Sequence, residues 1–88
     1  MARPMESQLY RELVDSGFNF VDRGTIGIND IYEAVKRQYP HLCDDEFPCV
    51  HRRPNALPEA EWKHTVRHAL STSPNATHSG RRGYWVFP

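Results

Sequence analysis

The chain has 88 residues, of which 39% are hydrophobic and 25% are charged, and this composition is typical of one globular domain rather than of a disordered segment. Its formal net charge of zero gives no overall attraction to a polyanion. No apolar run approaches the roughly 20 residues that span a bilayer, and two cysteines are too few for the disulfide framework of a small secreted domain. A domain this small leaves little room for an enclosed substrate pocket, so we expect a binding module rather than an enzyme.

The N-terminal third of the chain predicts one helix and one short strand. Residues 5–17 place Met5, Leu9, Leu13 and Val14 at helical spacing, and Gly17 is suited to end that helix in the left-handed conformation. The β-branched run at residues 25–28 predicts a brief strand.

A second helix is expected over residues 30–39. Asn29 is suited to the N-cap position, and acidic residues follow in the first turn, where the helix dipole favours them. Ile31 and Val35 share its apolar side, and Pro40 ends it. Residues 40–58 contain four prolines and both cysteines, and this composition predicts a long loop.

A third helix followed by a hairpin is expected after this loop. Pro58 is suited to the first turn of the helix, which we expect to run to about Thr72 with its apolar stripe at Trp62, Val66, Ala69 and Leu70. Residues 79–83 (SGRRG) separate two short runs of β character and predict a hairpin with a basic tip. We expect the core to contain Leu13, Ile31, Val35, Trp62, Val66, Leu70 and Trp85.

This order of elements predicts a single α+β, mainly α domain over residues 1–88. Three helices closed by a small antiparallel sheet with one wing form the winged-helix arrangement, a helix-turn-helix variant whose last helix can enter the major groove. Charge is also unevenly distributed: residues 1–50 carry five basic and nine acidic side chains, and residues 51–88 carry six basic and two acidic ones. A domain with one basic end can present a positive face to a polyanion while remaining neutral overall.

Three segments resemble the forkhead type of winged helix. Residues 25–40 (TIGINDIYEAVKRQYP) resemble its short strand and second helix, residues 62–71 (WKHTVRHALS) its recognition helix, and residues 84–87 (YWVF) the strand after its wing. A looser similarity links residues 43–45 (CDD), 58–59 (PE) and 62–64 (WKH) to winged-helix modules attached to prokaryotic restriction endonucleases, some of which read modified bases. The second context is favoured over a eukaryotic transcription factor, because His64 stands where forkhead proteins carry asparagine and because the segment between the third helix and the wing is short and atypical.

The resemblance implies a module that reads double-stranded DNA, as the target-recognition part of a restriction-type endonuclease or as a small transcriptional regulator. It places four residues where the recognition helix meets the bases: His64, Arg67, His68 and Ser71. Arg67 can donate two parallel hydrogen bonds to guanine, and either histidine can bond to a base edge. The alternative is that these residues form an ordinary solvated helix surface.

The backbone contacts are expected from other basic residues. Arg81 and Arg82 lie between two glycines at the expected wing tip, Tyr84 follows them, and Lys63 is a candidate phosphate ligand, as are Arg52 and Arg53. The alternative is that this segment is a hairpin loop whose charge only keeps it soluble.

The cysteine-containing loop leaves three possibilities open. Cys43, Cys49 and His51 form a C-x5-C-x-H pattern that could hold zinc, form a disulfide, or contain two plain thiols. The last is favoured because the spacing matches no known finger.

No cofactor and no metal is expected. The expected partners are double-stranded DNA and a nuclease domain in the full-length protein, and no membrane. The expected location is the cytoplasm with the nucleoid, or the nucleus in a eukaryote. The rival function is a winged helix used for protein–protein contact.

Overall fold

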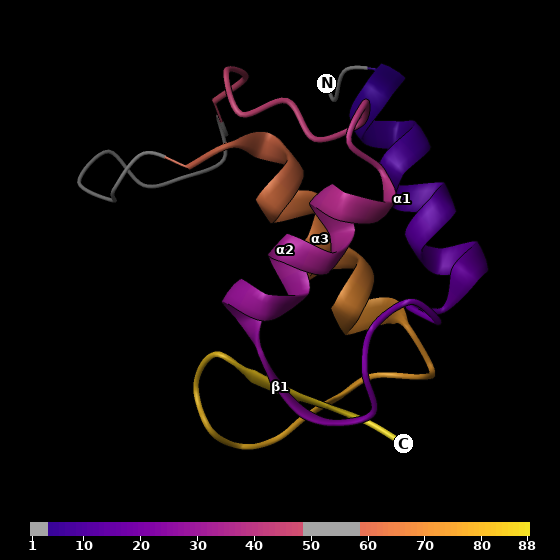
Figure 1. Ribbon diagram of the computed structural model, residues 1–88, viewed down its shortest axis with the longest axis vertical. Helices are drawn as coiled ribbons and strands as arrows, with labels where there is room; N and C mark the ends of the chain where they lie inside the picture. The colour runs from indigo at the N-terminus through magenta and orange to yellow at the C-terminus, as the bar shows by residue number, and fades with distance from the viewer. Residues whose placement is uncertain (1–3, 49–58) are drawn as a thin grey trace.

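Three α-helices and a three-stranded antiparallel sheet form the protein, as the computed structural model describes it at residues 4–48 and 59–88. The elements are α1 Pro4–Ser16, β1 Gly24–Gly27, α2 Ile28–Gln38, α3 Glu61–Thr72, β2 Thr77–His78 and β3 Tyr84–Phe87. The helices lie together above the sheet, which closes the lower end of the molecule in Figure 1. This confirms the predicted α+β class and the predicted order of elements.

The first helix ends at the glycine that its sequence indicates. The amide of Gly17 donates to the carbonyl of Leu13 at 3.0 Å, and Gly17 has a φ of 60°, in the left-handed region that glycine adopts without a Cβ penalty. Phe18 follows with a φ of 59° and is buried. The chain therefore turns sharply back toward the core after Gly17.

The second helix starts earlier than predicted. It begins at Ile28, and Gly27 occupies the N-cap position without a side-chain hydrogen bond, so the prediction of Asn29 as N-cap is wrong. The cause is tertiary: the amide of Ile28 donates to the carbonyl of Gly83 at 2.7 Å. A loop distant in sequence thus satisfies the first of the amides that have no partner within the helix.

The third helix starts later than predicted. We expected it to begin at Pro58, but it begins at Glu61. Ala60 forms an antiparallel bridge with Pro48, and the amide of Glu61 donates to the carbonyl of Phe47 at 2.9 Å. These bonds hold the chain extended up to Ala60, so the helix cannot include the residues before it.

The sheet has the strand order β1-β3-β2, so the C-terminal strand lies in the middle. Gly27 pairs with Tyr84 at one end of β1, and His78 pairs with Trp85 across the hairpin. The predicted hairpin is confirmed, with its loop at residues 79–83. In Figure 1 this loop projects beside the start of α2.

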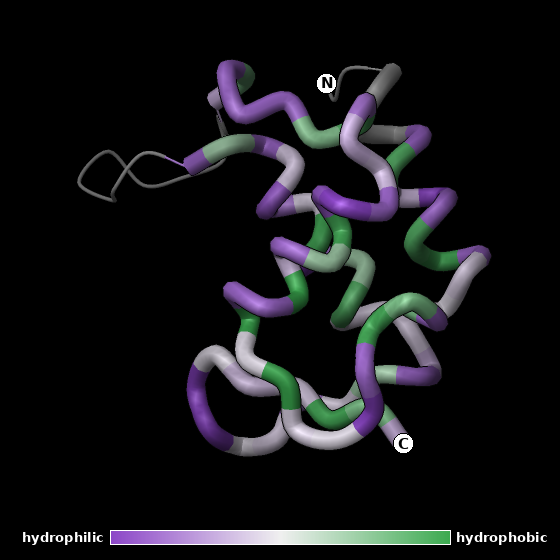
Figure 2. The backbone as a smooth tube through the Cα atoms, viewed as in Figure 1, coloured by the Kyte–Doolittle hydropathy of each residue, from purple (hydrophilic) through white to green (hydrophobic). Residues whose placement is uncertain are grey.

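The core is formed by one apolar side from each helix together with residues after α1, after α2 and in β3. Of the predicted core residues, Trp85 is only half-buried and packs against the edge of the cluster, and the other six have at most 1% exposure. Figure 2 shows the alternation of hydrophobic and hydrophilic stretches along the helices that follows from this one-sided burial. The buried hydrophobic residues are Leu9, Leu13, Phe18, Ile31, Val35, Cys43, Trp62, Val66, Ala69, Leu70 and Phe87.

Candidate nucleic-acid interface

The outward face of α3 is defined by the burial of its other face. Trp62, Val66, Ala69 and Leu70 are all buried, together with Glu61 and Thr65. At 3.6 residues per turn, positions 64, 67 and 71 point away from that buried side. His64 and Arg67 are partly exposed and Ser71 is exposed, so three of the four predicted base-contacting residues share the outward face of this helix.

Arg67 is held in place by two neighbours. Its Nη1 donates to Oε2 of Glu59 at 2.8 Å and to the hydroxyl oxygen of Tyr32 at 2.9 Å, and its Nη2 lies 2.7 Å from Oε1 of Glu59. The hydrogen bond to Glu59 is the main reason that the pKa of Arg67 is raised above its ordinary value. The guanidinium is therefore charged and oriented before any ligand arrives.

His68, the fourth predicted base-contacting residue, lies toward α1 rather than at the centre of the outward face. Its ring is tilted against that of Tyr10, with centroids 5.0 Å apart, while the side chain stays exposed. The hydroxyl of Tyr10 lies 3.2 Å from that of Thr72, one turn further along α3. His68 thus stands at the border of the face that carries His64, Arg67 and Ser71.

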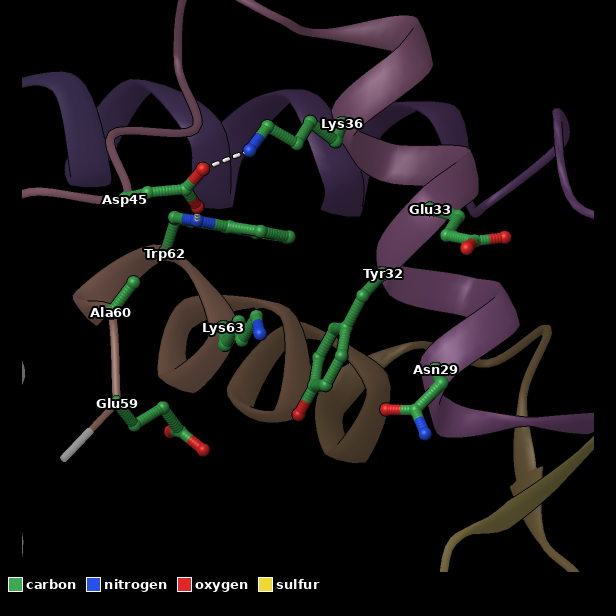
Figure 3. A pocket seen from close by; sticks show the side chains of 9 residues that line it. All are labelled: Asn29, Tyr32, Glu33, Lys36, Asp45, Glu59, Ala60, Trp62 and Lys63. Carbon is green, nitrogen blue, oxygen red and sulfur yellow. Dashed lines mark hydrogen bonds and ion pairs between the residues drawn. The ribbon is translucent and has the colours of Figure 1, made fainter. Parts of the chain in front are cut away.

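Lys63 lies on the other border, next to α2. Its Nζ is 5.4 Å from the ring centroid of Tyr32 and 5.7 Å from that of Trp62. The two rings themselves meet edge to face at 5.7 Å. Figure 3 shows the ammonium group of Lys63 beside the Tyr32 ring. Contact with the two ring faces orients the lysine stem while leaving its charge at the surface.

An open groove of about 670 Å³ separates α2 from the start of α3. Asp45 crosses its upper end: the carboxylate accepts a hydrogen bond from Nε1 of Trp62 at 2.7 Å and pairs with Lys36, as Figure 3 shows. The hydrogen bond from Lys36, followed by that from Trp62, lowers the pKa of Asp45 below its ordinary value of 3.8. Asp45 therefore neutralises one of the two lysines of this groove.

The loop between β2 and β3 carries the predicted wing arginines. Gly80 and Gly83 have φ values of 88° and 81°, which explains why glycine stands on each side of the arginines. The hydroxyl of Ser79 donates to the carbonyl of Tyr84 at 3.0 Å and accepts the amide of Arg81 at 3.1 Å. These bonds order the backbone of the loop.

The two wing arginines are exposed, and this charged tip is the purple segment of the loop in Figure 2. The guanidinium of Arg81 lies 4.5 Å from the ring centroid of Tyr84. Tyr84 thus contacts the side chain of Arg81, and the DNA backbone contact expected of both residues stays a prediction. Arg82 is held by no such ring in the described part of the chain.

Several predicted site residues fall outside the residues that the structure describes. Arg52 and Arg53 do so, and so do Cys49 and His51, so the zinc and disulfide hypotheses for that loop stay predictions. Cys43 is described: it is 6% exposed, and burial raises the pKa of its thiol to about 12. Within residues 4–48 and 59–88, no group of three or more histidine, cysteine or acidic side chains could hold a metal ion.

The sequence interpretation missed the acidic partners in this region. Glu59 falls within the helix expected from Pro58 and Asp45 within the expected loop, and no partner is predicted for either, whereas Glu59 pairs with Arg67 and Asp45 binds Trp62 and Lys36. Glu59 and Arg67 are eight residues apart, and Glu59 precedes the helix, so no helical spacing rule indicates this pair.

No protein-family model, curated protein or solved structure matches the chain. No helix in the described ranges combines the length and the apolar character needed to cross a membrane.

Proposed function

We propose that the chain is a winged-helix module that binds double-stranded DNA, with α3 in the major groove and the β2–β3 loop along the phosphate backbone. In this proposal His64, Arg67 and Ser71 read base edges with His68 beside them, and Lys63, Arg81 and Arg82 contact phosphates. The module would supply target recognition to a restriction-type endonuclease, whose catalytic domain lies elsewhere, or act as a small transcriptional regulator.

One observation supports the proposal most strongly: Arg67 and the wing are both tied to the start of α2. Arg67 donates to the hydroxyl of Tyr32, and Gly83 accepts the amide of Ile28. Ile28 and Tyr32 are four residues apart, so they are neighbours on one side of the helix. The base-reading helix and the basic loop therefore flank the same end of α2, as one duplex that contacts both would require.

The chemistry of the exposed groups also supports the proposal. Arginine donates to guanine O6 and N7, and cations at the border of a recognition helix neutralise phosphates. Lys63, Arg81 and Arg82 are three cations for which none of the described acids is an ion-pair partner. Neutralisation of three phosphates predicts that the logarithm of the binding constant falls with the logarithm of salt concentration with a slope of about −3.

The test is a titration of fluorescent duplex DNA with the protein, followed by anisotropy between about 50 and 200 mM salt. We expect the slope given above for the unchanged chain, and a slope shallower by about 1 for Arg82→Ala, with the same loss of affinity on every duplex. Arg37→Ala is the matched control, because it removes the same charge beside Asp22 and Glu33, on the side of α2 away from Tyr32.

A slope near zero, or equal effects of Arg82→Ala and Arg37→Ala, would contradict the proposal. Absence of binding to any duplex at the lowest salt would favour the protein–protein alternative instead.

A further inference from the structure

The side chain of Arg67 has an unusual position for a residue on an exposed helix face. It is 37% exposed, whereas the side chain of Glu59, with which it pairs, is only 17% exposed. Glu59 comes from the segment before α3, and Tyr32 comes from α2. Two elements outside α3 therefore fix the orientation of one side chain on its outward face.

The hydrogen bonds of Arg67 leave one edge of the guanidinium available. An arginine side chain has five N–H donors in a fixed plane. Nη1 uses its two donors in hydrogen bonds to Glu59 and Tyr32, and Nη2 faces the other oxygen of Glu59 in an ion pair at 2.7 Å. Within the described part of the chain these are all the hydrogen bonds and ion pairs that Arg67 makes. Nε–H and the N–H of Nη2 that points away from Glu59 are parallel and lie on the same edge.

This remaining edge has the geometry that guanine requires. Two parallel N–H groups match the adjacent N7 and O6 acceptors in the major groove. An arginine that is already ordered also loses less rotamer freedom on binding than one on a bare helix surface.

We propose that Glu59 and Tyr32 are positioning residues that present the Nε–Nη2 edge of Arg67 to a guanine and thereby set the base preference of the module, an inference that rests on the DNA-binding function proposed above. Glu59 also carries a negative charge toward a polyanion, and this charge lowers the affinity for every duplex. The two effects of Glu59 therefore have opposite signs, so its removal strengthens binding and weakens discrimination.

The experiment begins with selection of the preferred duplex from a randomised library by the unchanged chain. Each guanine of the selected site is then replaced in turn by 7-deazaguanine, which keeps Watson–Crick pairing and O6 but has a C–H group in place of N7. We expect one of these replacements to weaken binding by roughly tenfold, because one of the two parallel hydrogen bonds is lost. Arg67→Ala is expected to bind the two duplexes equally.

The positioning residues are tested by the ratio of the two affinities. Glu59→Gln and Tyr32→Phe are each expected to reduce the tenfold ratio to about twofold or less. Glu59→Gln is also expected to tighten binding to both duplexes at low salt, because a negative charge is gone. Partial unfolding of a variant would weaken binding to both duplexes alike and leave their ratio unchanged, so the ratio reports positioning rather than stability.

The matched control is Glu33→Gln. Glu33 lines the same groove, but its carboxylate points away from Trp62 and Glu59 in Figure 3. Its substitution removes the same charge and should tighten binding while keeping the full tenfold ratio.

Three results would overturn the inference while DNA binding itself stands: a selected site without guanine, a deazaguanine ratio that survives in Arg67→Ala, or a ratio that survives in both Glu59→Gln and Tyr32→Phe. If the unchanged chain binds no duplex at all, the proposed function fails instead.

Discussion

Asp45 links the loop after α2 to both helices that line the groove. Its carboxylate accepts the indole N–H of Trp62 and pairs with Lys36, although its side chain is 54% exposed. Trp62 itself is 1% exposed. Asp45 therefore satisfies the single polar atom of the largest fully buried side chain.

Replacement of Asp45 by alanine should lower the free energy of unfolding by about 1–2 kcal/mol, because the indole donor loses its partner in a partly buried position. The exposed pair with Lys36 contributes the smaller share. Asp45→Asn keeps an oxygen acceptor for Trp62, so it should lose less stability than Asp45→Ala. Urea unfolding at neutral pH measures both differences.

The same stabilisation should depend on pH. Because folding lowers the pKa of Asp45 below 3.8, its contribution is present above that value and is lost as the pH falls through the folded-state pKa. The difference in free energy of unfolding between the unchanged chain and Asp45→Ala should therefore become smaller in acid. Glu46→Ala, which removes an exposed neighbouring acid, is the control. Equal effects of Asp45→Ala and Glu46→Ala at neutral pH would contradict this role.

At the scale of single residues, the sequence predicts burial better than it predicts pairing. Trp62 and Leu70 are buried as their helical spacing indicates, and the arginines of the wing are exposed. The pairing of Arg67 with Glu59 and Tyr32 depends on how α2 and the segment before α3 meet. The spacing of residues along one helix does not indicate which residues of other elements will contact it.

At the scale of elements, the end of α1 is fixed by a contact with the segment after α3. The Nδ2 of Asn75 donates to the carbonyl of Gly17 at 3.2 Å. A Cβ at position 17 would clash with this same amide nitrogen, and the backbone there has a φ of 60°. Gly17 thus serves both the turn and the close approach of another element.

Gly17→Ala should therefore destabilise the fold by more than the roughly 1–2 kcal/mol that left-handed strain alone costs. In the background of Asn75→Ala the clash is absent and only the strain remains, so the same glycine substitution should cost less. Thermal or urea unfolding of the two single variants and the double variant gives the coupling free energy between positions 17 and 75. An equal cost of Gly17→Ala in the unchanged chain and in the Asn75→Ala background would contradict the role of this contact.

The order and type of the elements are predictable from the sequence, but two helix starts are not. The capping signal at Asn29 and the proline at position 58 both favour starts that the structure does not use. The observed starts depend on bonds from Gly83 to Ile28 and from Phe47 to Glu61. In each case a carbonyl distant in sequence accepts the first amide of the helix, and a local rule cannot detect such a partner.

At the scale of the whole molecule, ion pairs within each half of the sequence neutralise part of its charge. Asp45 from the acidic half pairs with Lys36 of the same half, and Glu59 pairs with Arg67. Lys63, Arg81 and Arg82 then remain as the basic groups nearest the outward face of α3 and the wing. The positive surface that we propose for DNA is thus smaller than the count of basic residues suggests.

The most direct test of the central claim is a ¹H–¹⁵N NMR titration of the chain with the duplex that it selects. We expect the largest amide shifts at residues 64–71 of α3 and at residues 79–83 of the wing, both next to the start of α2. Residues on the other side of α2, around Asp22 and Arg37, should stay unchanged. Shifts centred on Asp22 and Arg37, or no shifts with any duplex at low salt, would contradict the proposed DNA-binding face.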